Sequence, residues 1–376
     1  MSEVACIRAL EYGRDKVLGA VRRALSLLGG INRFISPGDR VLIKPNLLRP
    51  AAPEQAITTH PDLIWAVATL VKRAGGRAVV GDSSGGTLKG RGMTSTALDR
   101  TGARAAALDA GAEVINFDSY GTVEVAGIHI SRAVIEADVV ISLPKVKTHG
   151  LTVYTGAVKN MFGVVPGLLK SRLHRQAPTV PQFSEVLVDI YSACNVKLAV
   201  ADGILAMEGN GPSAGRPKHL GYIFASQDPV ALDAVVESIL GIPSGSVLTT
   251  TIAARRGLGV ADLSAIRVLG DQPVKTRFQL PDTTTVTRLP GFLSRWALDL
   301  MEIVPKISKR CTGCAVCVSS CPVSAIEDPS SGIRMDRCIR CLCCHELCPS
   351  QAVDLIPRHP TIRRIGSYLA KRSGRL

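Results

Sequence analysis

The sequence predicts an α/β fold in which a mostly parallel sheet carries helices on both faces, followed by a small α+β domain rich in cysteine. Three observations lead to this prediction. Over the first 270 residues, short apolar runs alternate with helical segments, which is the pattern of parallel strands buried on both faces. Hydrophobic residues make up 46% of the chain but aromatic residues only 4%, which suits a core rich in Ala, Val and Leu. Nine of the 11 cysteines lie between residues 311 and 348.

The strands and helices of the first domain follow from apolar runs and from the residues that flank them. The expected strands are 4–7, 40–44, 77–82, 113–117, 139–143, 198–202 and 222–225, each a short run rich in Val, Ile, Leu and Ala. The expected helices are 60–75, 95–111, 183–194 and 228–241, and a hairpin-like stretch precedes residue 139. In the last helix Asp228 caps the N-terminus and Pro229 takes the first helical position.

The 376 residues divide into four expected segments. Residues 1–270 form the α/β domain, 271–305 a connector, 306–357 the cysteine-rich domain and 358–376 a basic tail. The first part of the connector is polar and rich in Thr and Pro. Its second part is expected to form a helix that packs the two domains together, with one apolar face made by Phe292, Leu293, Trp296, Leu300, Ile303 and Val304.

Polar and charged residues follow the predicted strands of the α/β domain. In open α/β sheets ligands bind outside the carboxyl ends of the strands, so these residues are the expected binding site. Taken singly, an Asp that follows a strand also suits a helix cap. The predicted binding residues are Lys44, Asn46, Asp82, Ser83, Thr155, Gly156, Asp202 and Asn210.

The segment 139–184 contains no Asp or Glu but several Lys, Arg and His residues. Its lysines are suited to holding a carboxylate or phosphate, its first histidine to moving a proton near neutral pH, and its asparagine to orienting a carbonyl. Nearby glycines would bring backbone N–H groups to an anion. Exposed lysines and a structural histidine are the alternative for each residue taken alone. The predicted catalytic residues are Lys145, Lys147, His149, Lys159 and Asn160.

Eight cysteines form two runs with identical spacing, C-x₂-C-x₂-C-x₃-C-P. This is the spacing of bacterial-type ferredoxins with two [4Fe–4S] clusters, in which the fourth cysteine of each run binds the other cluster. The spacing predicts one cluster on Cys311, Cys314, Cys317 and Cys348, and a second cluster on Cys338, Cys341, Cys344 and Cys321.

Other uses of these cysteines fit the sequence less well. A disulfide framework needs an oxidising compartment, and the sequence shows no secretory signal. Zinc sites favour paired CxxC knuckles, not two runs that each end in Pro. The flanking residues 321–327 and 348–354 are also similar, which indicates an internal duplication. Cys343 lies outside the repeat and is expected to be a small buried side chain.

The net charge of +14 is concentrated in the segment 139–184 and in the last twenty residues. The first region suits an anion site or a surface for an acidic partner, whereas the second is a solvated tail or a segment that steers toward an acidic redox partner or an anionic surface. No recognition motif supports nucleic acid as a partner. No apolar run reaches the roughly 18–20 residues that a membrane-spanning helix needs, so we expect a cytoplasmic protein.

Several of these motifs together resemble the DUF362 family. The runs that carry the resemblance are Pro-Lys-x-Lys-Thr-His-Gly (144–150), Thr-Gly-Ala-x-Lys-Asn-x-Phe-Gly (155–163), Lys-Pro-Asn (44–46), Gly-Asp-Ser (81–83) and Asp-Pro-Val-Ala-Leu-Asp (228–233). The resemblance covers essentially the whole chain. It implies an iron–sulfur cluster-binding protein with a C-terminal ferredoxin domain, and no defined reaction. Many members begin with an export signal or a twin arginine, which this sequence lacks.

Three functions remain open from the sequence. The first is a reductase that passes electrons from a soluble ferredoxin or flavodoxin, through two [4Fe–4S] clusters, to a small anionic substrate held by Lys and His. The second is a non-catalytic electron-transfer subunit that docks an acidic redox partner. The third is a ligand-binding or redox-sensing protein.

Overall fold

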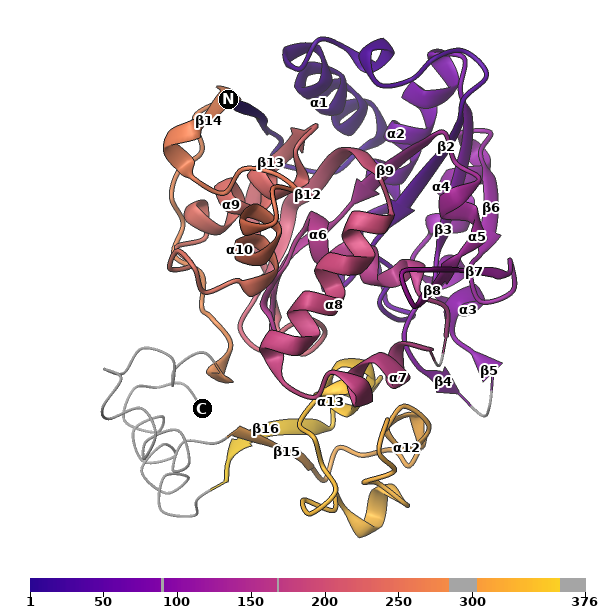
Figure 1. The fold of residues 1–376 in the computed structure, drawn as a ribbon, viewed down its shortest axis with the longest axis vertical. Coiled ribbons are helices and arrows are strands. Elements are labelled where there is room, and N and C mark those ends of the chain that lie inside the picture. The colour runs from indigo at the N-terminus through magenta and orange to yellow at the C-terminus, as the bar shows by residue number, and fades with distance from the viewer. Residues whose placement is uncertain (89–90, 168, 284–302, 359–376) are drawn as a thin grey trace.

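The computed structural model describes residues 1–88, 91–167, 169–283 and 303–358. Its first domain is built on a ten-stranded sheet with the order β14-β1-β13-β12-β9-β2-β3-β6, in which β10 pairs with β12, and β11 with β10 (Figure 1). The sheet strands are β1 (Ser2–Arg8), β2 (Arg40–Pro45), β3 (Arg77–Asp82), β6 (Glu113–Asn116), β9 (Val139–Leu143), β10 (Lys145–His149), β11 (Val153–Thr155), β12 (Val196–Glu208), β13 (Arg216–Ser226) and β14 (Ile266–Gly270).

The sheet is mostly parallel, as the sequence predicts. Strands β12, β9, β2, β3 and β6 pair in parallel one after another. Strand β13 runs antiparallel to both of its neighbours, β1 and β12, and β11 runs antiparallel to β10. Two hairpins stand outside the sheet, β4 (Thr87–Leu88) with β5 (Arg91–Gly92) and β7 (Thr122–Val125) with β8 (Ile128–Ser131).

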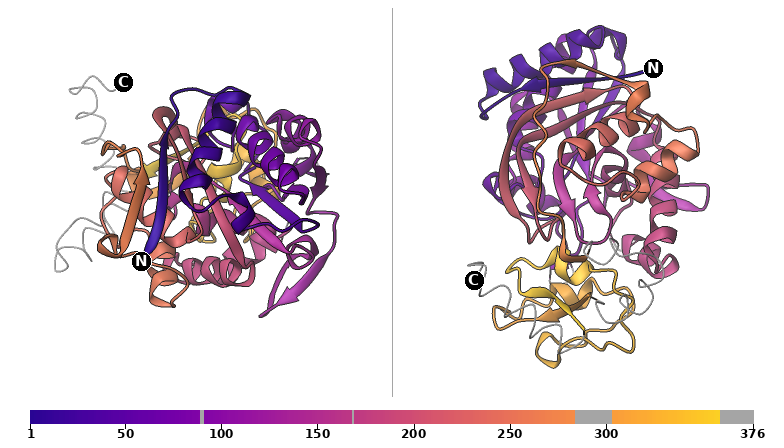
Figure 2. Two further views of the ribbon diagram at one scale, coloured as in Figure 1. Left: turned by 90° about the horizontal axis from the view of Figure 1, so that it is seen from above. Right: turned by 90° about the vertical axis from the view of Figure 1, so that its left-hand side faces the viewer.

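Helices cover both faces of the sheet because alternate residues of each strand are apolar on opposite sides. Val41 and Ile43 of β2 pack in the core beneath α1 (Arg14–Leu27) and α2 (Pro61–Arg73), whereas Leu42 packs in the core of the other face, with α8 (Val180–Ala193) (Figure 2). The remaining helices of the domain are α3 (Thr94–Arg100), α4 (Ala103–Asp109), α5 (Arg132–Ile135), α6 (Ala157–Asn160), α7 (Leu169–Gln176), α9 (Pro229–Ile239) and α10 (Leu248–Arg255).

Several elements differ from the sequence prediction, among them α1, α10, β11 and β14, which were not expected, and three that lie near the site. Strand β12 has 13 residues and does not end at Asp202, because a β-bulge between Gly203 and Leu205 lets the chain keep its pairing with β13. The helix expected over 95–111 is two helices, since Gly102 has a φ of 74° and ends the regular path between α3 and α4. The segment after β9, which is not among the expected strands, forms the strand β10. The predicted Asp228 cap of α9 is confirmed, with Pro229 at the first position.

The cysteine-rich domain repeats one backbone pattern twice. Its elements are β15 (Ile303–Ile307), α12 (Val316–Ser319), α13 (Cys343–Leu347) and β16 (Val353–Pro357), and β15 pairs antiparallel with β16. Ala325 N–H donates to Cys321 Sγ and Ala352 N–H to Cys348 Sγ, both at 3.2 Å. Left-handed residues also recur 27 positions apart, at Gly313 and Arg340, Ala315 and Leu342, and Ser324 and Gln351.

The helix expected to pack the domains together lies mostly outside the described residues, but its last two positions do not. Ile303 and Val304 begin strand β15, so their assignment to that helix is wrong. They pair with Pro357 and Ile356 of β16 and so close the edge of the cysteine-rich domain. Residues 276–283 instead run along the α/β domain, where Phe278 N–H donates to the carbonyl of Leu240 at 3.0 Å.

The cysteine-rich domain packs against the carboxyl-end edge of the parallel strands (Figure 2). Helix α13 makes the closest contacts, since a Cβ at Gly85, just beyond β3, would lie 2.5 Å from Leu347. Ser213 Oγ donates to the carbonyl of Glu346 at 2.7 Å, and Gln351 Nε2 donates to the carbonyl of Ser213 at 2.8 Å. The edge where a ligand site was expected therefore lies against a surface of the second domain.

Candidate functional site

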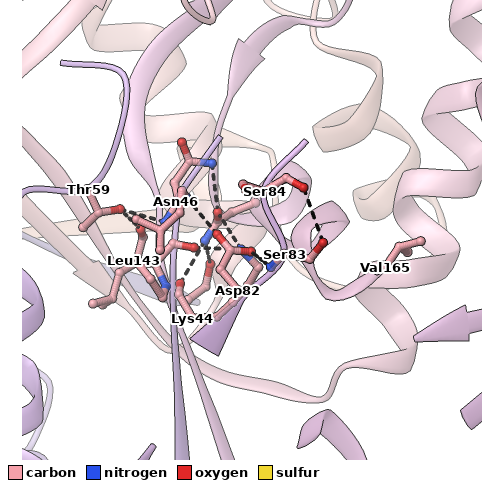
Figure 3. Close-up of polar contacts among 12 residues, drawn as sticks. Lys44, Asn46, Thr59, Asp82, Ser83, Ser84, Leu143 and Val165 are labelled. Carbon is pink, nitrogen blue, oxygen red and sulfur yellow. Dashed lines mark hydrogen bonds and ion pairs between the residues drawn. The ribbon is translucent and has the colours of Figure 1, made fainter. Parts of the chain in front are cut away.

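A buried ion pair lies at the ends of the adjacent strands β2 and β3. Lys44 Nζ lies 2.8 Å from Asp82 Oδ1, and the two side chains are 1% and 2% exposed (Figure 3). Asp82 also accepts hydrogen bonds from the backbone N–H groups of Leu47 and Ser83, both at 2.8 Å. Burial lowers the pKa of Lys44 and raises the pKa of Asp82, and the opposite charge of the partner counteracts each shift. This pair fixes the loops that follow both strands.

Asn160, at the end of α6, joins this pair to the rest of the site. Its Nδ2 donates to the Lys44 carbonyl at 3.1 Å and to Ser142 Oγ at 3.0 Å. Its Oδ1 accepts from Asn46 Nδ2 at 3.1 Å and from Lys44 Nζ at 3.3 Å. The next turn passes so close to the pair that a Cβ at Gly163 would lie 2.2 Å from Asp82 Oδ1. Only glycine fits there, which accounts for its place in the Asn-x-Phe-Gly run.

A cavity lies between this edge of the sheet and the cysteine-rich domain. Its remaining walls include Leu47, Leu48, Phe162, Lys170 and His174 from the first domain. The second domain contributes Ser320, Cys343, Glu346 and Leu347. Seven of the residues predicted from the sequence line it, namely Lys44, Asn46, Asp82, Ser83, Thr155, Lys159 and Asn160.

Several polar groups of this cavity have no hydrogen-bond partner within the described part of the chain. They are Asn46 Oδ1, Thr155 Oγ1, Ser320 Oγ and Glu346 Oε1, all of them buried. Lys159 makes no hydrogen bond or ion pair to the described residues either, and its ammonium lies 5.9 Å from the centre of the Phe162 ring. Buried polar atoms normally find partners, so this set is suited to the polar groups of a ligand.

The other predicted site residues lie outside the cavity wall. Lys145 Nζ donates to Asp202 Oδ2 and to Tyr12 Oη, both at 2.9 Å, and Asp202 also accepts from His60 N–H at 2.9 Å. The segment 139–184 contains no acidic residue of its own, but in the folded chain β12 places Asp202 beside Lys145. Both ends of this buried pair are already occupied by the protein.

Lys147 and His149 also have protein partners. Lys147 Nζ donates to the Ile57 carbonyl at 2.5 Å. His149 Nδ1 accepts from the N–H groups of Leu151 and Thr152, so its proton is on Nε2, which lies 3.4 Å from Glu346 Oε1. Burial, followed by the charges of Lys159 and Lys147, holds the pKa of His149 well below its ordinary value. His149 is therefore a neutral neighbour of the cavity residue Glu346.

Gly156 and Asn210 also contact other parts of the protein and not the cavity. A Cβ at Gly156 would lie 2.2 Å from Asp233 Oδ1, and that carboxylate accepts from the first N–H groups of α6. Asn210 binds Asp282 through both ends of its amide, at 2.8 and 2.9 Å. Both residues hold neighbouring segments in place and neither lines the cavity.

Sequence reasoning missed the wall that the second domain contributes. Ser320, Cys343 and Glu346 are adjacent to or between the cysteines of the two runs, which hid them as candidates. A comparison of the two copies of the internal repeat could have identified Cys343 and Glu346 as candidates. The positions that match Cys343 and Glu346 in the first copy are Val316 and Ser319, so only the second copy carries a thiol and a carboxylate at these positions. Burial raises the pKa of Glu346 to about 7, against the opposing charges of Lys159 and Lys147.

Lys170 is a further buried cation of the cavity that was not predicted as a site residue. Its ammonium donates to Ser83 Oγ at 2.6 Å, to the Ser83 carbonyl at 3.0 Å and to the Val165 carbonyl at 2.5 Å. Ser83 Oγ in turn donates to Asp118 Oδ1 at 2.6 Å. Burial lowers the pKa of Lys170 from 10.5 to about 8, an effect that Asp118 and Asp82 partly offset.

This shift predicts a pH dependence of stability. Between pH about 8 and 10.5 the unfolded chain holds a proton on Lys170 that the folded chain has released. Stability relative to a Lys170→Met variant is therefore expected to rise with pH across this window, by at most on the order of 3 kcal/mol. Urea denaturation of both proteins at pH 7.5 and 10 measures the difference. The same comparison with Lys197→Met, an exposed lysine of β12, should show no such rise; a pH-independent difference for Lys170→Met would contradict the prediction.

The cysteines are grouped in two sets. All eleven are free thiols. Cys321, Cys338, Cys341 and Cys344 line one cavity, together with Ile326, Ile339 and Leu342. Burial and the neighbouring thiols Cys314, Cys348 and Cys311 raise the pKa of Cys317 to about 11. In the part of the chain that the structure describes, no three Cys, His, Asp or Glu side chains converge on a single metal ion. Four thiols that line one cavity suit a polynuclear cluster.

Within the described ranges, no helix is both long enough and apolar enough to cross a bilayer.

Comparisons with known proteins agree with these features. A family model described as a domain of unknown function, DUF362, matches residues 41–237, and a model described as a 4Fe-4S binding domain matches residues 304–327. The chain is similar to a thylakoid-associated protein of Synechocystis sp., with 37% identity over 262 residues that cover 69% of this chain and 80% of that protein. The chain belongs to the DUF362 family, as its motifs indicate, and it ends in a 4Fe–4S binding domain.

Proposed function

We propose that this protein is an iron–sulfur reductase with two [4Fe–4S] clusters, which reduces a small anionic molecule bound in the cavity between its domains. One observation carries the proposal. The cavity that exposes Lys159, Asn46 and Thr155 is closed on its other side by Ser320, Cys343, Glu346 and Leu347. Three of these residues are next in sequence to a predicted cluster ligand. A ligand in the cavity would therefore lie beside both cysteine runs.

The ligand sets proposed for the two clusters are the crosswise sets expected from the spacing. Cys321, which belongs to the first run, lines the same cavity as the second run, and this supports the exchange of the fourth ligand. When bound, the clusters supply electrons one at a time. The chain's own residues must then bind the substrate, exclude water and deliver protons.

Lys159 is the proposed anion-binding residue, because the other lysines near the cavity already have protein partners. Lys44 pairs with Asp82, and Lys170 donates to Ser83 and Val165. A carboxylate or phosphate at Lys159 would complete the ammonium's bonding. Asn46 Oδ1 has no donor among the described residues, so the ligand should also carry a hydroxyl or N–H group. The hydroxyls of Thr155 and Ser320 can donate a hydrogen bond to the ligand or accept one from it.

The proposed reaction is reduction of a polarised C=C or C=O bond. A reduced ferredoxin or flavodoxin in the cytoplasm gives up two electrons, one after the other, and the double bond takes up these electrons with two protons to become a single bond. Lys159 gives one proton and is recharged by solvent, and water gives the other. Burial lowers the pKa of Lys159, with Glu346 and Cys343 acting against this, so its ammonium is a stronger acid than an exposed lysine.

The test uses anaerobically purified protein with its clusters and a panel of carboxylates and phosphate esters, among them whatever small molecule co-purifies by mass analysis. A binding anion should raise the melting temperature. Lys159→Met should weaken that anion about 10- to 150-fold, the value of one charge-assisted hydrogen bond, and leave cluster absorbance unchanged. Lys197→Met is the control, since Lys197 is exposed and distant in the sequence from the cavity residues.

Reduction is followed separately, as oxidation of the reduced donor in the presence of the bound anion. If no anion stabilises the protein, and Lys159→Met changes only salt-dependent association with an electron-transfer partner, the chain is an electron-transfer subunit and the reductase proposal fails.

A further inference from the structure

Arg49 is a buried cation whose bonding is incomplete. It lies in the segment that leaves β2 and passes the cavity, three residues after Asn46. Its side chain is 4% exposed, and Nη1 donates to the Pro50 carbonyl at 3.1 Å. Nε and Nη2 find no acceptor among the described residues, and no carboxylate there forms an ion pair with Arg49. A guanidinium stays protonated in a protein, so it cannot escape this situation by losing its charge.

Buried unpaired N–H groups on a charged side chain are costly, so a site of this kind calls for an anionic partner. The surroundings of Arg49 suggest which one. Leu48, its neighbour in sequence, packs with Cys314 against the apolar cluster of Met93, Val316 and Leu347. Burial lowers the pKa of Arg49, and the charge of a thiolate at Cys348 acts against this shift. The guanidinium therefore lies beside the cysteine-rich domain, near cysteines assigned to the first cluster.

We infer that Arg49 donates hydrogen bonds to the sulfur atoms of the cluster held by Cys311, Cys314, Cys317 and Cys348, and so raises the reduction potential of that cluster above that of the other. The inference rests on the two clusters and crosswise ligand sets of the proposed function. A [4Fe–4S] cluster with four thiolates is anionic and gains a further negative charge on reduction. Net charge and hydrogen bonds to sulfur are the factors that set its potential. A fixed cation with two free N–H groups stabilises the reduced state more than the oxidised one.

With Arg49 beside it, the first cluster would be surrounded by residues from both domains. The same segment between β2 and α2 carries Asn46 into the substrate cavity and Arg49 to the cluster. The residues that line the cavity of the second cysteine set are apolar or cysteine, and none of them is a cation. Electrons entering the protein would collect on the first cluster, which is bound by Cys348 next to the cavity residue Leu347.

The experiment is a redox titration of the full chain, with both clusters bound, followed by electron paramagnetic resonance. Arg49→Gln is expected to reduce the equilibrium constant for reduction of one cluster at least tenfold, a fall of about 59 mV for a one-electron couple, and to leave the other unchanged. Arg49→Lys keeps the charge and loses the planar donors, so its fall should be smaller. Arg73→Gln, at an exposed arginine of α2, is the control.

The outcomes separate this inference from the proposed function. If neither potential changes, or both fall equally, Arg49 does not act on one cluster and the inference is overturned, while two clusters and anion binding by Lys159 are unaffected. A single cluster in the unaltered protein overturns both the inference and the proposed ligand sets. If Arg49→Gln loses a cluster, Arg49→Lys decides the question, and its potential must then fall for the inference to stand.

Discussion

Replacing Lys44 by methionine is expected to lower the free energy of unfolding by about 3–5 kcal/mol, because it leaves the Asp82 carboxylate buried without its counter-charge. Asp82 is 2% exposed and would keep only the backbone N–H donors of Leu47 and Ser83. Its pKa, already raised by burial, would rise further once the ammonium is gone. Urea denaturation at neutral pH measures the loss.

Two comparisons make this prediction specific. The double variant Lys44→Met with Asp82→Leu should recover a large part of the loss, since it removes both buried charges together. Lys16→Met breaks the pair of Lys16 with Glu11, whose side chains are 64% and 67% exposed, and should lower the free energy of unfolding far less, because water screens the pair. A Lys44→Met variant as stable as Lys16→Met would show that the Asp82 carboxylate is not held charged in the fold.

The sequence indicated that Lys44 and Asp82 lie at the same edge of the sheet, because each stands at the end of an apolar run that forms a parallel strand. Apolar runs of five or six residues identified β2, β3 and β9, and in a parallel sheet the ends of such strands meet on one edge. Lys44 and Asp82 stand at the ends of adjacent strands, and the strand order brings them together. The same rule correctly placed Asn46 and Ser83 on the cavity.

The rule fails where polar residues continue a strand. Asp202 and Gly203 read as the end of a strand, yet β12 runs on to Glu208 past a bulge. Asp202 consequently lies within the sheet, opposite Lys145 of β10, and the two neutralise each other. Nothing local to either residue indicates this pairing, because the partners are 57 positions apart and the register depends on the bulge. Pairing between distant segments is set by tertiary packing and cannot be read from one stretch of sequence.

The docking of the second domain was predicted only in outline. The sequence places an iron–sulfur module after the α/β domain, but which of its two similar halves faces the cavity depends on complementary surfaces. The half that carries α13 does so, where Leu347 fills the space left by Gly85 and Gly86 and Glu346 binds Ser213 through its carbonyl. The absence of side chains at Gly85 and Gly86 thus leaves room for a leucine from the other domain.

The exchange of the fourth ligand between the two cysteine runs gives the other prediction of large effect. In the crosswise arrangement Cys314 and Cys348 bind the same cluster, so the variant Cys314→Ala with Cys348→Ala is expected to lose one cluster and keep the other. Cys314→Ala with Cys321→Ala removes a ligand from each cluster and is expected to lose both. Iron and sulfide content per chain, together with resonance spectra of the reduced protein, measures the number of clusters that remain.

The alternative arrangement, in which each run binds its own cluster, predicts the reverse outcome for the two variants. Comparing the two variants therefore distinguishes the arrangements. If each run bound its own cluster, Cys314→Ala with Cys321→Ala would keep one cluster and Cys314→Ala with Cys348→Ala would lose both. Cys343 is next to Cys344 and lines the substrate cavity, so both variants should be made with Cys343→Ala to prevent it from replacing a lost ligand. The 3.2 Å hydrogen bonds from Ala325 to Cys321 and from Ala352 to Cys348 hold the fourth thiol of each run in matching positions. Because the two copies are equivalent in this way, altering Cys321 in place of Cys348 alongside Cys314 should change the number of clusters that remain from one to none without otherwise changing the fold.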